Sequence, residues 1–248
     1  MIISQKEDKN KETAVLMAAG LGQRMRPLTN DTPKPLVRVL GTPMAETVIN
    51  GLRKRGIDEI YVVTGHLGEQ FSYLEYRYPG LALVKNEEYK TVNNISSVRA
   101  VTDIIRGRNV FICEADLYIP DPSLFDTVLN GSCYFGKYVS GHSDDWVFDR
   151  DEKGFITRVG KVGENCYNMC GISYFTREDS SILADAIDDR YCRPGYEELF
   201  WDEVVNENLD KLRLTVHPVE DRQITEIDSV AELAAVDHLY IKYVKENL

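Results

Sequence analysis

Cysteine and long apolar runs are both scarce in this chain. Its five cysteines are an odd number at irregular spacings, which disfavours a disulfide framework, and Cys166 and Cys170 have no second pair with which to form a zinc site. No stretch approaches the roughly 20 apolar residues that a membrane-spanning helix requires. The first dozen residues also lack the apolar segment of a secretory signal. We therefore expect a cytoplasmic protein with buried free thiols.

Basic residues are outnumbered as well. The 248-residue chain carries 29 Lys+Arg against 40 Asp+Glu, which gives a formal net charge of −11. Such a field repels nucleic-acid backbones and disfavours general binding to nucleic acid. The length and the 43% of hydrophobic residues suffice to bury a core without disulfides or a structural metal. The composition thus predicts an ordinary globular protein.

Apolar runs alternate with helical patterns in the first half of the chain. Buried strands are predicted at residues 13–20, 59–65, 81–84 and 109–113, because continuous apolar runs are typical of strands buried on both faces. Helices are predicted at residues 43–56, 67–78 and 94–106. This alternation predicts an α/β fold of Rossmann-like type, with a mixed, mainly parallel central sheet and helices on both faces.

The second half of the chain changes character. Short strands are predicted at residues 132–139, 146–149, 155–159 and 171–175. Helices are predicted at 177–190, at 197–208 and from Val230 onward, with a strand at 212–219. No internal repeat or linker divides the sequence. We therefore predict a polar N-terminal extension over residues 1–12 and a single domain over residues 13–248.

The strongest chemical signal lies in residues 18–36, directly after the first predicted strand. Gly20 and Gly22 allow the loop to bring backbone N–H groups against phosphate oxygens. Three prolines stiffen the loop, which lowers the entropic cost of presenting its charges. Those charges are the cations Arg24, Arg26 and Lys34. The combination predicts a polyphosphate site, and a stiff surface loop with incidental basic residues is the alternative.

Two familiar phosphate-binding motifs do not match. A dinucleotide fingerprint requires a third glycine at the position of Met25. The P-loop pattern occurs only as a near miss at residues 131–137, followed by Tyr138 where a magnesium-binding Ser or Thr should stand. The loop instead resembles the signature loop of the nucleotidyltransferases that make nucleoside-diphosphate sugars and alcohols. This resemblance implies that the loop holds the triphosphate and that Lys34 neutralises developing negative charge.

Two aspartates could hold the divalent cation that triphosphate chemistry requires, because magnesium prefers one or two carboxylates with phosphate and water oxygens. Asp116 follows an apolar strand, and Asp228 precedes a predicted helix. Either residue alone could be a helix cap or a turn residue. The family resemblance implies that the two share one Mg²⁺. Many relatives carry a glycine before the first of these aspartates, whereas this chain has Glu114 and Ala115 before Asp116. This difference leaves open whether Glu114 also approaches the ion.

Both tryptophans stand beside carboxylates. Asp145 precedes Trp146, and Asp202 follows Trp201, with Glu198 nearby. Aromatic faces next to acids suit a cationic head group, since an ammonium over an indole is stabilised by about 0.5–2 kcal/mol. Large aromatic residues mostly pack in cores, however, so either tryptophan alone could be a core anchor.

Over residues 13–240 the chain resembles the bacterial CTP:phosphocholine cytidylyltransferases and the related CTP:2-aminoethylphosphonate cytidylyltransferases. The matching segments are 92–98, 114–118, 145–146, 200–202 and 225–229. The resemblance implies catalytic roles for Arg24, Lys34, Asp116 and Asp228. It implies nucleotide contacts for Leu16, Ala18, Ala19, Gly20, Gly22, Asn93, Asn94 and Ser97. In a small acceptor-binding subregion it implies contacts for Trp146, Glu198, Trp201 and Asp202, and it leaves Lys161 and Tyr118 open.

The expected reaction is an in-line attack of the acceptor oxygen on the α-phosphorus of CTP, with pyrophosphate leaving. No general base is needed, because a phosphate or phosphonate acceptor is largely ionised near neutral pH. The expected partners are CTP and a small zwitterionic phospho- or phosphono-amine. Two alternatives stay open: a sugar-1-phosphate nucleotidyltransferase that uses UTP, dTTP or GTP, and a non-catalytic nucleotide-binding regulatory subunit. Neither the choice between phosphocholine and 2-aminoethylphosphonate nor the oligomeric state can be predicted.

Overall fold

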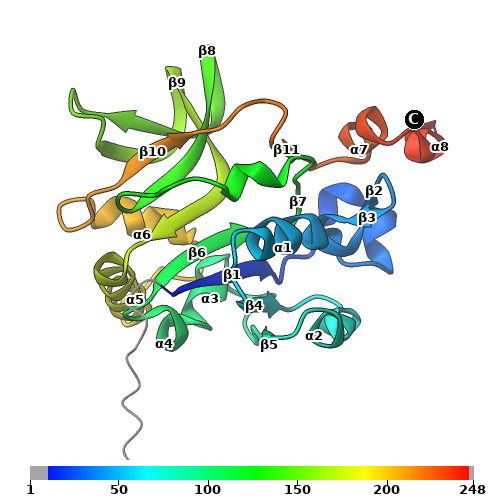
Figure 1. Ribbon diagram of the computed structural model, residues 1–248, viewed down its shortest axis with the longest axis horizontal. Helices are drawn as coiled ribbons and strands as arrows, with labels where there is room; N and C mark the ends of the chain where they lie inside the picture. The colour runs from blue at the N-terminus through cyan, green and yellow to red at the C-terminus, as the bar shows by residue number, and fades with distance from the viewer. Residues whose placement is uncertain (1–10, 246–248) are drawn as a thin grey trace, which may run out of the picture.

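The central sheet draws strands from both halves of the chain. Residues 11–245 are described by the computed structural model in Figure 1. Within this range, seven strands form one mixed sheet in the order β10-β8-β9-β6-β1-β4-β5. Residues 1–10 of the predicted polar extension lie outside the described residues, and the first strand begins at Glu12, one residue before its expected start.

The N-terminal half supplies the parallel part of the sheet. Strand β1 (Glu12–Ala18) lies between β4 (Glu59–Thr64) and β6 (Asn109–Glu114), and β5 (Leu81–Lys85) lies outside β4. The pairings of β1 with β4, β4 with β5 and β1 with β6 are all parallel. The predicted parallel strands are therefore confirmed, and their continuous apolar runs reflect burial on both faces.

Helices cover both faces of this sheet, because successive side chains of a strand point to opposite faces. Leu16 packs in one core with α1 (Met44–Lys54), whereas its neighbour Val15 packs in a second core with four other helices. Those four are α3 (Ile95–Arg99), α4 (Thr102–Ile105), α5 (Arg177–Tyr191) and α6 (Trp201–Glu207). The predicted α/β fold class is confirmed.

The prediction of four short strands in the second half is wrong. The structure has two long strands, β8 (Cys133–Arg150) and β9 (Ile156–Phe175), which pair antiparallel with several register shifts. Phe148 pairs with both Val159 and Tyr167, so this part of β8 lies between two stretches of β9. The polar residues between the predicted runs lie at register shifts within these strands rather than at chain-ending turns. The strand predicted at 212–219 shortens to β10 (Thr215–Pro218), parallel to β8.

Four predicted helices are divided or shortened in the structure: those at 67–78, at 94–106, at 197–208 and from Val230 onward. The segment 94–106 forms two helices because Val101 leaves the helical region, with φ −124° and ψ 9°. The helix predicted at 197–208 begins only at Trp201, since Phe200 is extended and its N–H donates to Glu203 at 2.8 Å. The shorter helices are η4 (Gly68–Phe71), α2 (Tyr73–Arg77), η5 (Pro122–Phe125), α7 (Val230–Val236), η6 (His238–Tyr240) and α8 (Ile241–Lys245).

Between residues 11 and 245, no helix has the length and apolar character needed to cross a membrane.

A small pairing outside the main sheet joins distant parts of the chain. Strand β7 (Leu117–Tyr118) pairs antiparallel with β11 (Thr225–Glu226). Asp116 directly precedes β7, and Asp228 comes shortly after β11. This pairing brings two aspartates that are far apart in the sequence to the carboxyl end of β6.

Candidate active site

The glycine-rich segment after β1 folds as a series of short turns. These are the 3-10 helices η1 (Gln23–Met25), η2 (Leu28–Asn30) and η3 (Lys34–Leu36), followed by the hairpin of β2 (Arg38–Val39) and β3 (Thr42–Pro43). Gly22 lies in the left-handed region with φ 59°, and a β-carbon there would lie 2.8 Å from Cβ of Lys34. Thr29 Oγ1 donates a hydrogen bond to the Gly22 carbonyl at 2.8 Å. Glycine at position 22 therefore lets the loop close over Lys34.

Four charged residues meet at the mouth of this loop. Lys34 Nζ lies 2.6 Å from Asp116 Oδ2 and 2.7 Å from Asp228 Oδ1, and an Arg24 guanidinium nitrogen lies 2.9 Å from Asp228 Oδ1. Burial lowers the pKa of Lys34, but its ion pairs with both aspartates outweigh burial and leave the pKa above its ordinary value. The structure thus brings together all four residues that the sequence predicts to be catalytic.

A cavity of about 430 Å³ opens beside this charged cluster. Its walls contain most of the residues predicted to bind the nucleotide or to take part in catalysis: Ala18, Ala19, Gly20, Gly22, Arg24, Lys34, Asn94, Ser97, Asp116 and Asp228. Leu16 is not among the lining residues, because it is fully buried in the core. Asn93 is also outside the wall, since its side chain donates to the Glu198 carbonyl at 3.0 Å. We call this space the nucleotide cavity.

Asn86 is a supporting residue that sequence reasoning missed. It follows β5, is 2% exposed, and donates through its amide to Ser96 Oγ at 2.8 Å and Ser97 Oγ at 3.2 Å. Ser97 lines the nucleotide cavity. The only available signal in the sequence was a polar residue directly after an apolar strand.

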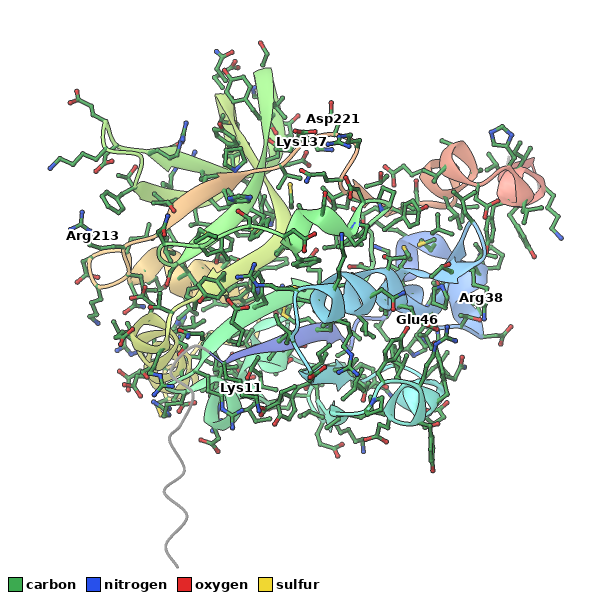
Figure 2. All side chains as sticks on the ribbon, viewed as in Figure 1. Lys11, Arg38, Glu46, Lys137, Arg213 and Asp221 are labelled. Atoms are coloured by element: carbon green, nitrogen blue, oxygen red, sulfur yellow. The ribbon has the colours of Figure 1, made fainter. Side chains whose placement is uncertain are left out.

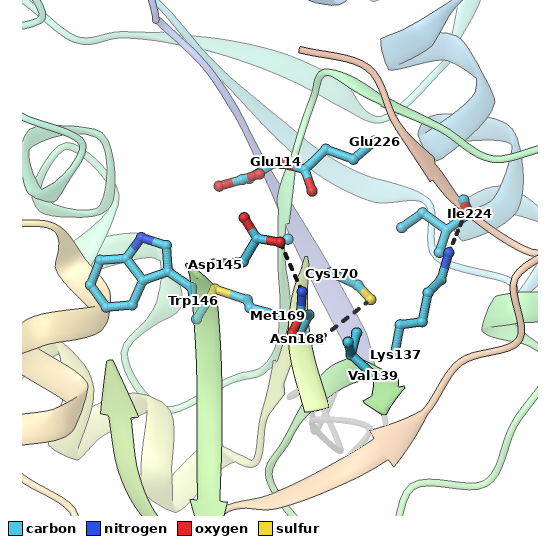
Figure 3. Close-up of a pocket in the computed structure, with 11 residues that line it drawn as sticks. Glu114, Lys137, Val139, Asp145, Trp146, Asn168, Met169, Cys170, Ile224 and Glu226 are labelled. Atoms are coloured by element: carbon cyan, nitrogen blue, oxygen red, sulfur yellow. Dashed lines mark hydrogen bonds between the residues drawn. The ribbon is translucent and has the colours of Figure 1, made fainter. Parts of the chain in front are cut away.

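A second cavity, of about 200 Å³, adjoins the first and is rich in carboxylates (Figure 3). We call it the acidic cavity. Its polar and charged lining consists of Glu114, Lys137, Asp145, Asn168 and Glu226, and Trp146 forms an aromatic wall. Glu114, Trp146 and Glu226 line both cavities. Asn168 is oriented by its side-chain N–H bond to Asp145 Oδ2, at 2.8 Å.

Lys137 is the cation of the acidic cavity, but its ammonium is directed to one side. Its Nζ lies 3.5 Å from the Ile224 carbonyl (Figure 3) and 3.3 Å from Asp221 (Figure 2). These contacts tie β8 to the segment that leads into β11. The opposite side of the cavity, next to Trp146, keeps its negative character.

Two acidic side chains lie where the two cavities meet, and both are hard to ionise. Burial, with further repulsion from Asp116, raises the pKa of Glu114 well above its ordinary value. Burial and the neighbouring Asp228 raise the pKa of Glu226 to about 7. A carboxylate that is hard to ionise marks a place where an added positive charge would be stabilised. Glu226 was not assigned from the sequence, although it stands two residues before the predicted Asp228.

Trp146 is supported by an aromatic partner and a lysine. Its ring meets that of Phe200 in an edge-to-face arrangement with centroids 5.4 Å apart. Lys161 Nζ lies 5.7 Å from both ring centroids. Phe200, which also lines the nucleotide cavity, was missed by sequence reasoning, and its only signal was its position beside Trp201.

The other predicted acceptor residues lie outside the walls of both cavities. Trp201 is 3% exposed and stacks on Tyr134 with ring centroids 5.9 Å apart. Asp202 is 4% exposed and accepts a hydrogen bond from the Tyr134 hydroxyl at 2.9 Å. Glu198 is exposed, and none of the three lines the nucleotide cavity or the acidic cavity. In this arrangement Trp201 and Asp202 anchor α6 in the core. Their position is therefore that of core residues, the alternative to acceptor binding that the sequence left open for the tryptophan.

The donor set fits a divalent cation that is shared with a triphosphate. Among residues 11–245, no cluster of three or more His, Cys, Asp or Glu side chains forms a complete protein metal site. Asp116 and Asp228 nevertheless converge on one ammonium, that of Lys34, so a cation can lie between them. Magnesium commonly takes one or two carboxylates and obtains its other ligands from phosphates and water. These two aspartates therefore fit the ion.

Comparisons with known proteins agree with this geometry. Residues 14–151 match the MobA-like NTP transferase domain. The chain is 54% identical over 231 residues to a 2-aminoethylphosphonate cytidylyltransferase of Lancefieldella rimae, covering 93% of this chain and 94% of that protein. It is 32% identical over 232 residues to a choline-phosphate cytidylyltransferase of Streptococcus pneumoniae, covering 91% and 97%. The solved CTP:phosphocholine cytidylyltransferase of that organism matches with a TM-score of 0.84 and 30% identity over 92% of this chain and 99% of the other.

Proposed function

The chain belongs to the family of MobA-like NTP transferases and is a cytidylyltransferase, and from this premise we propose that it joins CTP to 2-aminoethylphosphonate. The products are the CMP-phosphonate and pyrophosphate. The observation that carries the proposal is the pair of adjoining cavities, one lined by the cations of the glycine loop and the other by carboxylates. Phosphocholine, which also combines an anionic phosphorus group with a cationic nitrogen, is the second candidate acceptor.

The loop residues bind and orient the nucleotide. Backbone N–H groups near Gly20 and Gly22, together with Arg24 and Lys34, hold the phosphates of CTP. An oxygen of the acceptor's phosphonate attacks the α-phosphorus, the new P–O bond forms, and the bond to the β-phosphate breaks. Positioning and charge stabilisation account for the rate, since the ionised acceptor needs no general base.

Asp116 and Asp228 would hold a magnesium ion together with the phosphates. When bound, the ion supplies positive charge against the oxygens of the triphosphate. The two carboxylates line the same cavity as Arg24 and Lys34, so the ion would lie close to both cations' phosphate ligands. The protein's own part is therefore to present two carboxylates and two cations to one polyphosphate.

The acidic cavity favours a primary ammonium group. A primary ammonium has three N–H donors, and the carboxylates of Asp145 and Glu226 accept such bonds. A quaternary ammonium has no N–H donor and would depend on the face of Trp146. This difference supports 2-aminoethylphosphonate over phosphocholine.

A substrate screen tests the proposal. Pyrophosphate release is measured with each of CTP, UTP, dTTP and GTP against 2-aminoethylphosphonate, phosphocholine and glucose 1-phosphate. We expect turnover with CTP and a preference for 2-aminoethylphosphonate. Turnover only with the sugar phosphate would favour the sugar nucleotidyltransferase, and tight nucleotide binding without pyrophosphate release would favour a regulatory subunit.

A neighbouring pair of aspartates offers a matched control for the acceptor site. Asp145→Asn removes a carboxylate of the acidic cavity, and we expect kcat/KM for 2-aminoethylphosphonate to fall roughly tenfold more than that for phosphocholine. Asp144→Asn changes the adjacent residue, whose carboxylate is 86% exposed and faces His142. Equal losses for both acceptors in Asp145→Asn would contradict the assignment of the amine to this cavity.

A further inference from the structure

The cations and the carboxylates of the active site are paired with each other. Lys34 contacts both Asp116 and Asp228, and Arg24 contacts Asp228. The triphosphate requires the two cations, and the metal requires the two acids. The cations that would bind the triphosphate are therefore neutralised by the two aspartates that would bind the metal, and these aspartates are neutralised by the cations.

We propose that CTP and the divalent cation bind by exchanging these ion pairs, so that each ligand binds weakly alone and each strengthens the binding of the other. The triphosphate takes Lys34 and Arg24, and this frees Asp116 and Asp228 for the metal. The inference rests on the proposed function, because it assumes that this cluster binds CTP and a metal. Such coupling is reciprocal: the factor by which CTP strengthens metal binding equals the factor by which the metal strengthens CTP binding.

Lys34 carries most of this coupling, because it is the more firmly held cation. Its side chain is 9% exposed, whereas that of Arg24 is 74% exposed. The Lys34 backbone lies between Pro33 and Pro35, and a β-carbon at Gly22 would meet its Cβ at 2.8 Å. The main chain at Lys34 is thus fixed, and only the outer part of the side chain can turn from the aspartates toward a phosphate. Arg24 can leave Asp228 for solvent at little expense, since exposed ion pairs contribute little.

Metal binding without nucleotide is the first test. Mn²⁺ binding is followed by electron paramagnetic resonance of the free ion, with MnCl₂ added to the full-length protein in the absence of CTP. We expect Lys34→Met to bind Mn²⁺ roughly tenfold or more tightly than the unaltered protein, because its aspartates have lost their internal cation. Arg26→Met is the matched control: it removes a cation of the same loop that does not line the nucleotide cavity, and its Mn²⁺ affinity should equal that of the unaltered protein. An unchanged affinity in Lys34→Met would overturn the proposal.

Nucleotide binding without metal is the complementary test. In EDTA, calorimetric titration with CTP should give a tighter Kd for Asp116→Asn than for the unaltered protein, because Lys34 has lost one partner. Asp121→Asn removes a carboxylate that pairs with Arg222 instead and should leave this Kd unchanged. Thermal unfolding shows whether each variant folds. If either Lys34→Met or Asp116→Asn does not fold, the other variant still tests the proposal.

The failure of this inference can be told apart from the failure of the proposed function. If the unaltered protein binds CTP together with Mn²⁺ but Lys34→Met and Asp116→Asn leave both single-ligand affinities unchanged, the ion-pair exchange is wrong and the cytidylyltransferase site stands. If no CTP binds even with saturating Mn²⁺, the assignment of the nucleotide cavity is itself wrong.

Discussion

The position of a single glycine determines how closely the loop approaches Lys34. Gly22 has φ 59°, and an added β-carbon would meet Cβ of Lys34 at 2.8 Å and Cγ2 of Thr29 at 3.1 Å. The side chains of Lys34 and Thr29 thus pack against the backbone of residue 22. At Gly20, by contrast, an added β-carbon meets no atom within 4 Å.

These two glycines give a matched pair of variants. Gly22→Ala is expected to lower the free energy of unfolding by about 1–2 kcal/mol, because alanine is strained in the left-handed region and also crowds Lys34. Gly20→Ala should change it by less than about 0.5 kcal/mol. Urea unfolding of both variants measures the difference. Equal losses would mean that the close approach at residue 22 is not a constraint on the loop.

Asp202 makes the stability of the protein depend on pH. Burial raises the pKa of Asp202 from an ordinary 3.8 to about 7. Between these two values the folded protein holds a proton that the unfolded chain has lost, so the contribution of Asp202 to the free energy of unfolding falls as pH rises through this window. Asp202→Asn is always neutral and keeps an oxygen that can accept the bond from Tyr134.

The measurement compares urea unfolding of the two proteins at about pH 5 and about pH 8. We expect the free energy of unfolding to decrease less between these pH values in Asp202→Asn than in the unaltered protein. Glu114 and Glu226, whose pKa values are also raised, are present in both proteins, and the charge of Asp202 helps to raise the pKa of Glu114. The difference therefore reports Asp202 together with its effect on Glu114. A larger decrease in the variant would mean that Asp202 is ionised in the folded state.

The elements of the parallel half were predictable from sequence, whereas the elements that complete the site were not. Strands β1, β4, β5 and β6 are continuous apolar runs, and such runs directly encode burial on both faces. The ribbon of β8 and β9 carries polar residues inside its strands, so local patterns divide it into pieces. The pairing of β7 with β11 spans two residues on each strand, which is too short for any pattern. The meeting of Asp116 and Asp228 could be anticipated only from the family resemblance.

At the scale of elements, Asn86 connects the end of β5 to the start of α3. Its amide bonds to Ser96 and Ser97 are buried, so losing them would free the Ser97 hydroxyl from its position in the nucleotide cavity. We expect Asn86→Ala to raise KM for CTP roughly tenfold with little change in kcat, since a positioning residue acts on the bound ground state and transition state alike.

A double-mutant cycle separates this role from a general loss of stability. Ser97→Ala should raise KM for CTP similarly, and the double variant should be no worse than either single change, because both remove the same hydroxyl contact. Additive losses would mean that Asn86 affects the nucleotide by a route other than Ser97.

The whole molecule adds a long-range field to these local contacts. The net charge of −11 surrounds a nucleotide cavity whose own lining contains Glu114, Asp116, Glu226 and Asp228 against Arg24 and Lys34. Composition predicted this acidity and so disfavoured nucleic acid. Composition did not reveal that Arg24 and Lys34 form ion pairs with aspartates. These ion pairs form only because the pairing of β7 with β11 brings the aspartates together in the fold. We therefore expect the net charge to repel a polyanionic nucleotide that approaches from solution.

The sign of this field can be measured through the salt dependence of association. Stopped-flow mixing with a fluorescent CTP analogue in EDTA gives the association rate constant. We expect that constant to rise by a factor of about 2–5 between about 20 and about 200 mM salt, because added ions screen the repulsion over distances near 10 Å. With the nucleotide as a metal complex, which carries less negative charge, the rise should be smaller. A steep fall with salt in both cases would mean that the loop cations dominate the field, and that they are not neutralised by Asp116 and Asp228 in the free protein.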